Sequence, residues 1–444
     1  MTAFSIPEKI INKLSQNGYD AYFVGGCVRD FLRGEAFTDI DICTSATPEE
    51  VKKCFSEETI IETGIKHGTV TLLFCGESFE ITTFRSEQGY NDSRHPSNVE
   101  FIKSINEDLS RRDFTMNAIA LKDGIITDPF GGSQDIKNKI IRTVGNPDER
   151  FKEDALRILR ALRFSSVLGF EIEEKTAESI FKNKELLCHV SKERIAVEFN
   201  KILLGKNVEN ILINYSSVIA VFIPEILQTI NFNQHNPFHI YDVYTHIVKA
   251  VASSENNIYI RLTMFFHDMA KPQCFSLDND GIGHFKKHAD KSSDMAKIVL
   301  NRMKYDNKTI DTVCFLVKNH YTKLLCEKSF IKMFMKTCGA ENFKRLLAVM
   351  RADNIAKNGA ARDRLMHIDN LENLFNIIIK NNECFLLKDL AVNGSDLLVL
   401  GFSGKNIGDL LDIILNKVIT GEIENDRNKI LSSSLLKELT QNNP

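Results

Sequence analysis

Two aspartates separated by one residue, Asp39 and Asp41, follow a glycine pair and an arginine in the segment GGCVRD. In a strand, positions i and i+2 project to the same face, so both carboxylates point the same way. Adjacent carboxylates repel unless a cation lies between them, and hard oxygen ligands suit Mg²⁺ together with substrate phosphates. Gly25 and Gly26 let the backbone approach an anion, and the planar guanidinium of Arg29 can donate two parallel hydrogen bonds to a phosphate. The pattern predicts a metal-dependent site that transfers a nucleotide.

Further charged residues extend this predicted site. Glu80 lies in the strand-like run SFEITTFR, where a third carboxylate beside the aspartate pair could complete a metal site that activates a hydroxyl group. Arg111 and Arg112 are adjacent and could clamp a triphosphate, and Asp113 could accept hydrogen bonds from ribose hydroxyls. The alternative is a solvent-facing glutamate on a strand and surface arginines at a capped helix start.

A helix is predicted over Glu153–Leu168, and four of its charged residues recur every third position: Asp154, Arg157, Arg160 and Arg163. That spacing forms a slanted ridge that rises about 13 Å, comparable to an extended nucleotide. A base at the Asp154–Arg157 end, with phosphates near Arg160 and Arg163, fits this ridge. The alternative is a solvated salt bridge between Asp154 and Arg157 within the helix, worth a few tenths of a kcal/mol.

The Asp154–Arg157 pair implies a rule for base selection. A carboxylate only accepts hydrogen bonds and a guanidinium only donates them. Cytosine and adenine each present an amino donor beside a ring acceptor, which matches this pair. Uracil and guanine present the reverse pattern and would leave buried groups unpaired. One protein template could therefore select C and A.

Composition places the chain among ordinary globular proteins. Its 444 residues, 43% of them apolar, suffice for the cores of two or more domains. The ten cysteines form no C-x-x-C pair, which is typical of a reducing compartment. The N-terminus shows no apolar signal region, and no apolar run approaches the roughly 20 residues of a membrane span. We expect a cytoplasmic protein that does not enter membranes.

The order of elements predicts an α+β chain, with an N-terminal mixed β-sheet followed by helices almost throughout. Short β-rich runs alternate with turns up to the cluster Asp128-Pro129-Phe130-Gly131-Gly132, and helical periodicity follows it. The predicted strands are Ala21–Val24, Asp39–Cys43, Thr69–Phe74, Phe79–Phe84 and Val99–Phe101. The expected domains are a head (1–136), a helical neck that recognises the base (137–205), a helical body (206–380) and a helical tail (381–444).

As a set, these segments resemble the bacterial class II tRNA nucleotidyltransferase and poly(A) polymerase family. The matching segments are GGCVRD, DIDI, HGTV, EITTFR, RRDFTMNAIA, DPFGG, EDALRILRALRF and SKERI, with VNGSDLL further along. The resemblance implies that Asp39 and Asp41 bind the metal and that Gly26, Arg29 and Arg112 bind the triphosphate. It also implies tRNA, CTP and ATP as partners, with no nucleic-acid template.

Two segments favour the CCA-adding branch of this family. GIKHGTV (64–70) resembles that branch, whereas poly(A) polymerases carry an arginine-rich segment there and a basic C-terminal tail. The polar stretch 86–98 resembles the loop that helps the switch from C to A addition. We expect addition of CCA to tRNA, while an enzyme that adds only A and a poly(A) polymerase stay open as alternatives.

The second half holds histidines and aspartates in an order that resembles the HD metal-dependent phosphohydrolases: His246, His267-Asp268 and Asp353. Imidazole and carboxylate ligands suit a divalent metal that activates water. His288 and His320 fall where two-metal HD domains place extra histidines, and His284 is a further candidate. His239 and Asp242 could orient His246.

The resemblance implies a nucleotidyltransferase whose HD domain could also bind a divalent metal and hydrolyse phosphate esters, and two alternatives stay open. One is a metal-free HD fold that only braces tRNA. The other is a metal phosphohydrolase whose head serves only to bind RNA. The expected cofactors are Mg²⁺ in the head and, if the HD residues bind metal, a second divalent metal in the helical body.

Overall fold

The computed structural model describes residues 4–37, 39–62, 64–65, 68–90, 96–236, 240–357, 362–434 and 436. The chain forms two compact units that divide between Pro224 and Glu225, within the segment expected to be a helical body. We call them the N-terminal and C-terminal units. In the part of the chain that the structure describes, no helix is long and apolar enough to cross a membrane.

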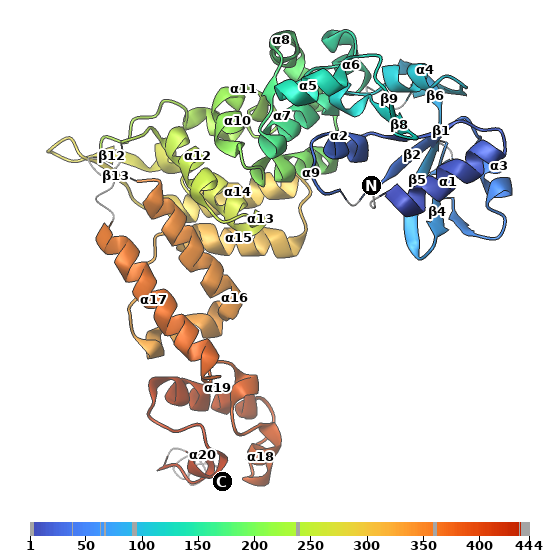
Figure 1. The fold of residues 1–444 in the computed structure, drawn as a ribbon. Helices are drawn as coiled ribbons and strands as arrows, with labels where there is room; N and C mark the ends of the chain where they lie inside the picture. Colours follow the sequence, from blue (N-terminus) through green and yellow to red (C-terminus); the bar gives the residue numbers. More distant parts are fainter. Residues whose placement is uncertain are drawn as a thin grey trace. The chain divides into compact units, whose positions relative to one another are not determined.

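The N-terminal unit is built on a mixed sheet, which confirms the predicted α+β class (Figure 1). Within the described residues this sheet has seven strands in the order β3-β4-β5-β2-β1-β8-β9. Its strands are β1 (Ala21–Val24), β2 (Asp41–Thr44), β3 (Thr59–Ile61), β4 (Thr69–Phe74), β5 (Glu77–Thr83), β8 (Ala120–Lys122) and β9 (Ile125–Thr127). β2 and β5 run parallel, and their register pairs Asp41 with Glu80.

Helices cover this sheet through their apolar positions. Ile10, Ile11 and Leu14 are buried on one face of α1 (Ser5–Gln16), and α1 contacts β1. α2 (Gly26–Leu32) begins directly after β1, so the turn between them lies at the carboxyl end of that strand. α3 (Pro48–Cys54) starts with a capping box formed by Thr47 and Glu50 and a first-turn proline.

The segment that follows β5 leads toward the neck. β6 (Arg85–Tyr90) and β7 (Pro96–Phe101) pair as a hairpin across the stretch expected to be a polar loop, and residues 91–95 of that stretch lie outside the described residues. His67 of the HGTV segment also lies outside them. α4 (Ile105–Ser110) and the 3₁₀ turn η3 (Thr115–Asn117) come before β8.

The neck is helical, and its central pair is α7 (Leu156–Leu168) against α9 (Lys192–Leu203). Ser166 Oγ of α7 donates to the Ile202 carbonyl at 2.7 Å, which fixes this contact. The remaining elements are α5 (Gly132–Asn138), β10 (Ile140–Ile141), α6 (Pro147–Glu153), β11 (Glu171–Ile172), α8 (Glu174–Asn183), η4 (Lys184–His189), α10 (Val208–Asn214) and α11 (Ser216–Ile219).

The helix predicted over 153–168 is wrong at its start. α6 ends at Glu153, Asp154 has extended backbone angles (φ −140°, ψ 104°), and α7 begins at Leu156. Asp154 therefore lies in the turn between two helices, whereas Arg157, Arg160 and Arg163 lie on α7. The ridge of four residues on one helix does not exist as predicted.

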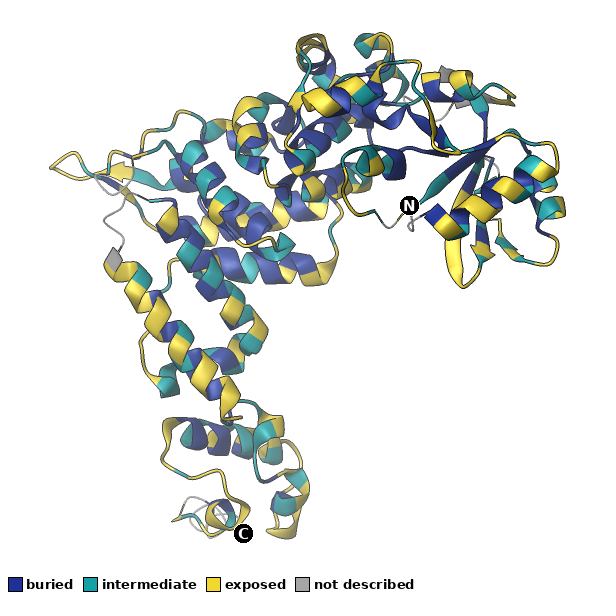
Figure 2. Ribbon diagram, in the orientation of Figure 1, coloured by how far each residue is buried: buried dark blue, intermediate teal, exposed yellow. Residues whose placement is uncertain are grey.

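The C-terminal unit is helical apart from the small hairpin of β12 (Phe275–Leu277) and β13 (Gly283–Phe285). Its helices are α12 (Val243–Ser253), α13 (Ile258–Phe266), α14 (His288–Arg302), α15 (Asn307–Asn319), α16 (Lys328–Ile355), α17 (Arg362–Lys380), α18 (Gly394–Val399), α19 (Lys405–Thr420) and α20 (Arg427–Leu431). The 3₁₀ turns are η5 (Pro224–Gln228), η6 (Lys271–Cys274) and η8 (Leu387–Asp389). Figure 2 shows buried residues along the facing sides of α12, α13 and α15.

Candidate active site and candidate metal centre

The acidic residues of the head come together through the parallel pairing of β2 and β5. Asp41 opens β2 and lies beside Glu80 of β5. Asp39 comes two residues earlier, and the strand predicted to include it begins only at Asp41. Burial raises the pKa of Asp41, the Arg112 guanidinium opposes this shift, and the carboxylates of Glu80 and Asp39 add to it. A buried carboxylate whose charged form is disfavoured by two neighbouring acids fits a site for a divalent cation.

Gly25 forms the backbone wall next to these acids. Its φ of +72° lies in the left-handed region, which glycine adopts without strain. A Cβ atom at this position would lie 3.2 Å from Asp41 Oδ2 and 3.3 Å from Arg112 Nη1. Any larger residue would therefore crowd both the acid and the guanidinium.

The arginines of the head are held in place by acids of their own. Arg29 donates through Nε and Nη2 to the two carboxylate oxygens of Asp30 at 3.0 and 2.7 Å, and through Nη1 to Asn117 at 2.9 Å. Arg111 and Arg112 share the buried Asp108, with ion pairs of 2.8 and 3.3 Å. These partners fix the guanidinium groups before any ligand arrives.

Asp113 is held by neighbouring donors in the same way. It accepts from Arg160 Nε at 2.7 Å, from the Asn117 amide at 3.2 Å and from the Phe114 backbone N–H at 2.9 Å. Burial alone would raise the pKa of Asp113, but the charges of Arg160 and Arg157 and the hydrogen bonds from Arg160 and Asn117 together outweigh it and lower the pKa to about 2. Arg163 continues the row, with an ion pair of 2.9 Å to Glu198.

The ion pair between Asp113 and Arg160 predicts that the free energy of unfolding depends on pH. Because the folded pKa of Asp113 is about 2 and its ordinary value is 3.8, Asp113 stabilises the fold above pH 4, and this contribution is lost as pH falls toward 2. The difference corresponds to about 2 kcal/mol. In urea unfolding, we expect wild type to exceed Asp113→Asn by that amount at pH 6, with the gap closing below pH 4. A gap that stays constant down to pH 2 would contradict the assignment.

Asp154 and Arg157, the predicted base template, are each oriented by a different partner. Asp154 accepts from Arg194 of α9 at 2.8 Å and from the Leu156 N–H at 3.0 Å. Arg157 pairs with Glu153 at 2.6 Å and also donates to the Arg111 carbonyl at 3.0 Å. The alternative of a salt bridge between Asp154 and Arg157 within one helix is therefore wrong. The sequence did not reveal Arg194 or Glu153 as positioning partners.

All predicted site residues of the N-terminal unit line one cavity of about 770 Å³, a volume typical of ligand sites. They are Gly25, Gly26, Arg29, Asp39, Asp41, Glu80, Arg111, Arg112, Asp113, Asp154, Arg157, Arg160 and Arg163. Arg194, Asn117 and Phe164 line it as well and were missed. The carboxylates of the head and the two residues of the template thus face the same space.

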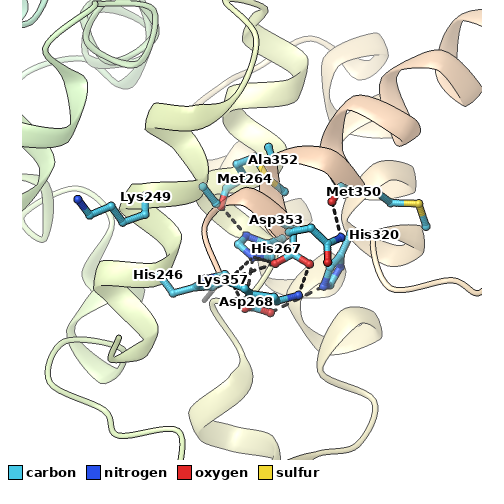
Figure 3. Close-up of polar contacts among 12 residues, drawn as sticks. His246, Lys249, Met264, His267, Asp268, His320, Met350, Ala352, Asp353 and Lys357 are labelled. Atoms are coloured by element: carbon cyan, nitrogen blue, oxygen red, sulfur yellow. Dashed lines mark hydrogen bonds and ion pairs between the residues drawn. The ribbon is translucent and has the colours of Figure 1, made fainter. Parts of the chain in front are cut away.

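The C-terminal unit brings its six predicted metal ligands together. Figure 3 labels His246, His267, Asp268, His320 and Asp353 among them. One group consists of His246, His267, Asp268 and Asp353, and the other of Asp268, His288 and His320. All six residues are buried, and within each group the candidate ligand atoms lie within 4.8 Å of one another. Asp268 belongs to both groups. Its Oδ2 lies 3.3 Å from His246 Nε2, and its Oδ1 lies 3.4 Å from His288 Nε2.

Hydrogen bonds fix the tautomers of the histidines in the second group. Nδ1 of His288 lies 2.8 Å from the Phe285 carbonyl, and Nδ1 of His320 lies 2.6 Å from the Val317 carbonyl. A carbonyl only accepts, so each Nδ1 carries the proton. Burial lowers the pKa of both rings, to about 3 for His320, so both are neutral. Their Nε2 lone pairs then face each other at 3.2 Å, which fits a cation between them.

The first group also favours positive charge. Burial disfavours the charged form of His267, but Asp268 and Asp353 outweigh this effect and raise the pKa of His267 to about 9. Lys271 Nζ lies 2.7 Å from Asp268, and Lys357 pairs with Asp353. The sequence did not identify Lys357, although it follows Asp353 at the i+4 spacing of helical neighbours.

The remaining predicted histidines and Asp242 lie elsewhere. His284 pairs with Asp278 at 2.7 Å, is exposed and belongs to neither ligand group, so its prediction as a ligand is wrong. Asp242 caps α12 by accepting from the backbone N–H groups of Tyr244 and Thr245, so its side chain positions the helix that carries His246. His239 lies outside the described residues.

Three family models match the chain. The Poly A polymerase head domain matches residues 21–142, and the probable RNA and SrmB-binding site of polymerase A matches 169–227. The tRNA nucleotidyltransferase domain 2 matches 285–433. The first match includes Asp39, Asp41 and Glu80 together with Arg29, Arg111 and Arg112. The third includes three of the six candidate metal ligands, His288, His320 and Asp353.

Curated proteins and solved structures resemble the chain over different lengths. A CCA-adding enzyme of Lactobacillus delbrueckii subsp. bulgaricus is 53% identical over 199 residues, which cover 45% of this chain and 50% of that protein. The CCA-adding enzyme of Bacillus cytotoxicus is 42% identical over 280 residues, 61% of this chain and 70% of that protein. The crystal structure of Bacillus stearothermophilus CCA-adding enzyme in complex with CTP covers 99% of this chain and 98% of its own, with 31% identity and a TM-score of 0.72.

The matched segment spans about half the length of the first of these curated relatives, whereas the match to the Bacillus cytotoxicus protein spans more than two thirds of it. The structural match extends over nearly the whole of both chains. The chain belongs to the family of CCA-adding enzymes.

Proposed function

We propose that this chain adds CCA to the 3′ ends of tRNA, using CTP and ATP and releasing pyrophosphate. The observation that carries the proposal is the single cavity that holds the acids of the head together with Asp154 and Arg157. The names of the family's members support this activity. We also propose a cytoplasmic location, because all ten cysteines are free, as is usual in a reducing compartment.

In the proposed reaction, the 3′-hydroxyl of the tRNA attacks the α-phosphate of the nucleotide in line. The new P–O bond joins the nucleotide to the RNA, the bond to pyrophosphate breaks, and the hydroxyl proton is lost. Asp39 and Asp41, with Glu80 beside them, would hold Mg²⁺, which supplies positive charge to the triphosphate. Arg29 and Arg112 bind the phosphates, so catalysis rests on positioning and electrostatics.

In this proposal, Asp154 and Arg157 select the incoming base through hydrogen bonds. Asp154 accepts from the amino group of cytosine or adenine, and Arg157 donates to the neighbouring ring nitrogen. Arg194 and Glu153 hold the two side chains in position, so the template is rigid before a nucleotide enters. A base with the reversed donor pattern leaves these partly buried groups unpaired.

The decisive experiment is a nucleotide-by-nucleotide extension assay on tRNA that ends before the CCA. We expect two additions with CTP alone and a third when ATP is supplied. No incorporation of C would identify the enzyme as one that adds only A. Long A tails on unrelated RNAs would identify it as a poly(A) polymerase.

We propose a second function for the C-terminal unit, a divalent-metal centre that hydrolyses phosphate esters. The specific support is the pair of facing Nε2 lone pairs of His288 and His320 next to Asp268. The two candidate ligand groups would hold one or two metal ions, which would supply an activated water. A fold that only braces tRNA needs no such arrangement of neutral imidazoles.

Metal stoichiometry tests this centre directly. His320→Ala is expected to lower the Mn²⁺ or Co²⁺ bound per chain, because one ligand of the second group is lost. His284→Ala is the matched control, since His284 lies in the same unit but in neither ligand group. Bound metal measured after dialysis should fall only in the first variant. Equal metal content in both variants would exclude His320 as a ligand.

A further inference from the structure

An aromatic ring in the cavity of the N-terminal unit is surrounded by positive charge. Phe164 of α7 lines this cavity and is 7% exposed. The Cζ atoms of three guanidinium groups lie over its ring, 5.3 Å from the centroid for Arg29, 5.6 Å for Arg160 and 4.0 Å for Arg163. All three distances fall within the range of about 6 Å in which an aromatic face attracts a cation.

The three arginines reach this ring from two parts of the chain. Arg163 directly precedes Phe164 and Arg160 lies one helical turn earlier, so α7 itself brings both groups near the ring. Arg29 belongs to α2 in the head, and its place over the same ring depends on how the head packs against the neck. The ring therefore gathers arginines of the head and of the neck at one place in the cavity.

The ring holds these arginines in a different way from their acidic partners. Asp30, Asp113 and Glu198 each pair with one of the three arginines, at 2.7, 2.6 and 2.9 Å. A carboxylate occupies N–H donors and offsets positive charge. An aromatic ring attracts a cation through its negative face but carries no net charge. The ring therefore holds the guanidinium groups and leaves their positive charge for a ligand.

Core packing alone does not account for the surroundings of this ring. Phe164 meets the buried Phe114 edge-on, with centroids 5.7 Å apart and planes at 84°, which is an ordinary core contact. The guanidinium groups are different neighbours, because like charges that converge repel one another. Their convergence in a cavity favours a ligand with several negative charges, as a triphosphate has.

We propose that Phe164 is a positioning residue whose ring holds these three guanidinium groups toward the triphosphate of the incoming nucleotide. The inference rests on the proposed nucleotide transfer and gives Phe164 a role that acts through the arginines. Without the ring the arginines stay in the cavity, but their side chains must be ordered when the nucleotide binds. Affinity for the phosphates should then fall, while recognition of the base should not.

Binding of CTP and CMP in the absence of tRNA tests this role, because no acceptor is present and no turnover occurs. The two nucleotides share base and sugar and differ only in their phosphates. By calorimetry with Mg²⁺ on the full chain, Phe164→Leu is expected to lower the ratio of CTP to CMP affinity about tenfold, through the loss of desolvated cation–π contacts. The ratio of CTP to UTP affinity should keep its wild-type value, because Arg194 and Glu153 hold the base template.

Pentafluorophenylalanine at position 164 separates the charge of the ring from its packing. It keeps the shape of a phenyl ring but reverses the charge on its face, so it should preserve the fold and lower the CTP to CMP ratio as leucine does. Phe55→Leu is the matched control. Phe55 is fully buried in the same unit, has Lys13 Nζ 4.7 Å from its ring centroid and does not line the cavity. This control should keep the wild-type ratio.

A wild-type CTP to CMP ratio in both variants at position 164 would overturn the inference, as would an equal fall in Phe55→Leu. A fall with leucine but not with pentafluorophenylalanine would also overturn it, because packing would then explain the effect. These results are independent of nucleotide transfer. A wild-type chain that binds CTP but adds no C to shortened tRNA would overturn the proposed function instead.

Discussion

Asp41→Ala is expected to lower nucleotide addition about 1000-fold or more, because a metal that stabilises a transferring phosphoryl group is worth several kcal/mol. Burial and the carboxylates of Glu80 and Asp39 raise the pKa of Asp41, and the Arg112 charge opposes this shift. Its removal takes away a predicted metal ligand whose Oδ2 lies 3.2 Å from where a Cβ atom on Gly25 would stand. Single-turnover addition of CMP to a shortened tRNA measures the loss.

Glu80 and Glu77 offer a matched comparison on one strand. Both lie on β5, but only Glu80 pairs with Asp41 and lines the cavity, while Glu77 is exposed at the start of the strand. We expect Glu80→Ala to weaken Mg²⁺ binding and slow addition, and Glu77→Ala to do neither. Phosphate-ester hydrolysis by the C-terminal unit should survive Asp41→Ala. Normal addition by Asp41→Ala would exclude Asp41 as a metal ligand that the reaction needs.

The acids of the head could be predicted from the sequence because their signal is local. The spacing of two led to the prediction that Asp39 and Asp41 lie on one side of a strand. The strand begins only at Asp41, yet both residues line the same cavity. The neighbour of Asp41 could not be derived in the same way, because the parallel pairing of β2 with β5 joins segments about 40 residues apart. A parallel register is set by the packing of the whole sheet, which no short segment encodes.

The break at Asp154 had no visible signal. The segment EDALRILRALRF contains neither glycine nor proline, and its leucines, alanines and arginines favour a continuous helix. Asp154 instead uses its carboxylate to accept from the Leu156 N–H, a local bond through which aspartate competes with helix formation. Its ion pair with Arg194 joins residues 40 positions apart, and that contact exists only after α7 and α9 pack.

In the C-terminal unit, the candidate metal ligands could be predicted from the sequence, whereas the residues around them could not. The resemblance to HD phosphohydrolases pointed to six candidate ligands, and the structure brings these six residues together. The carbonyl partners that fix the tautomers of His288 and His320 belong to the backbone and carry no side-chain signal. A cavity that His320 and Asp353 line likewise depends on residues from α16 and α17, which sequence alone cannot bring together with Tyr321.

Asp154→Ala is expected to lower discrimination against UTP and GTP by about 10- to 100-fold, because a buried hydrogen-bonding group is worth about 1–3 kcal/mol of selection. Addition of C and A should slow at the same time, whereas Mg²⁺ binding should remain, because Asp154 is not among the acids of β2 and β5. Single incorporation of each of the four nucleotides, with kcat and KM resolved, measures the change. Glu149→Ala, an exposed acid on α6, is the matched control.

Arg194→Ala distinguishes an oriented template from a carboxylate that merely lies near the base. Because Arg194 holds Asp154 at 2.8 Å, its loss should leave the acceptor in place but free to rotate. Selection should then fall less than in Asp154→Ala, and the double variant should lose little more than Asp154→Ala alone, since both changes act through one side chain. Additive losses would mean that Arg194 contacts the nucleotide itself. Normal selection in Asp154→Ala would show that another part of the cavity reads the base.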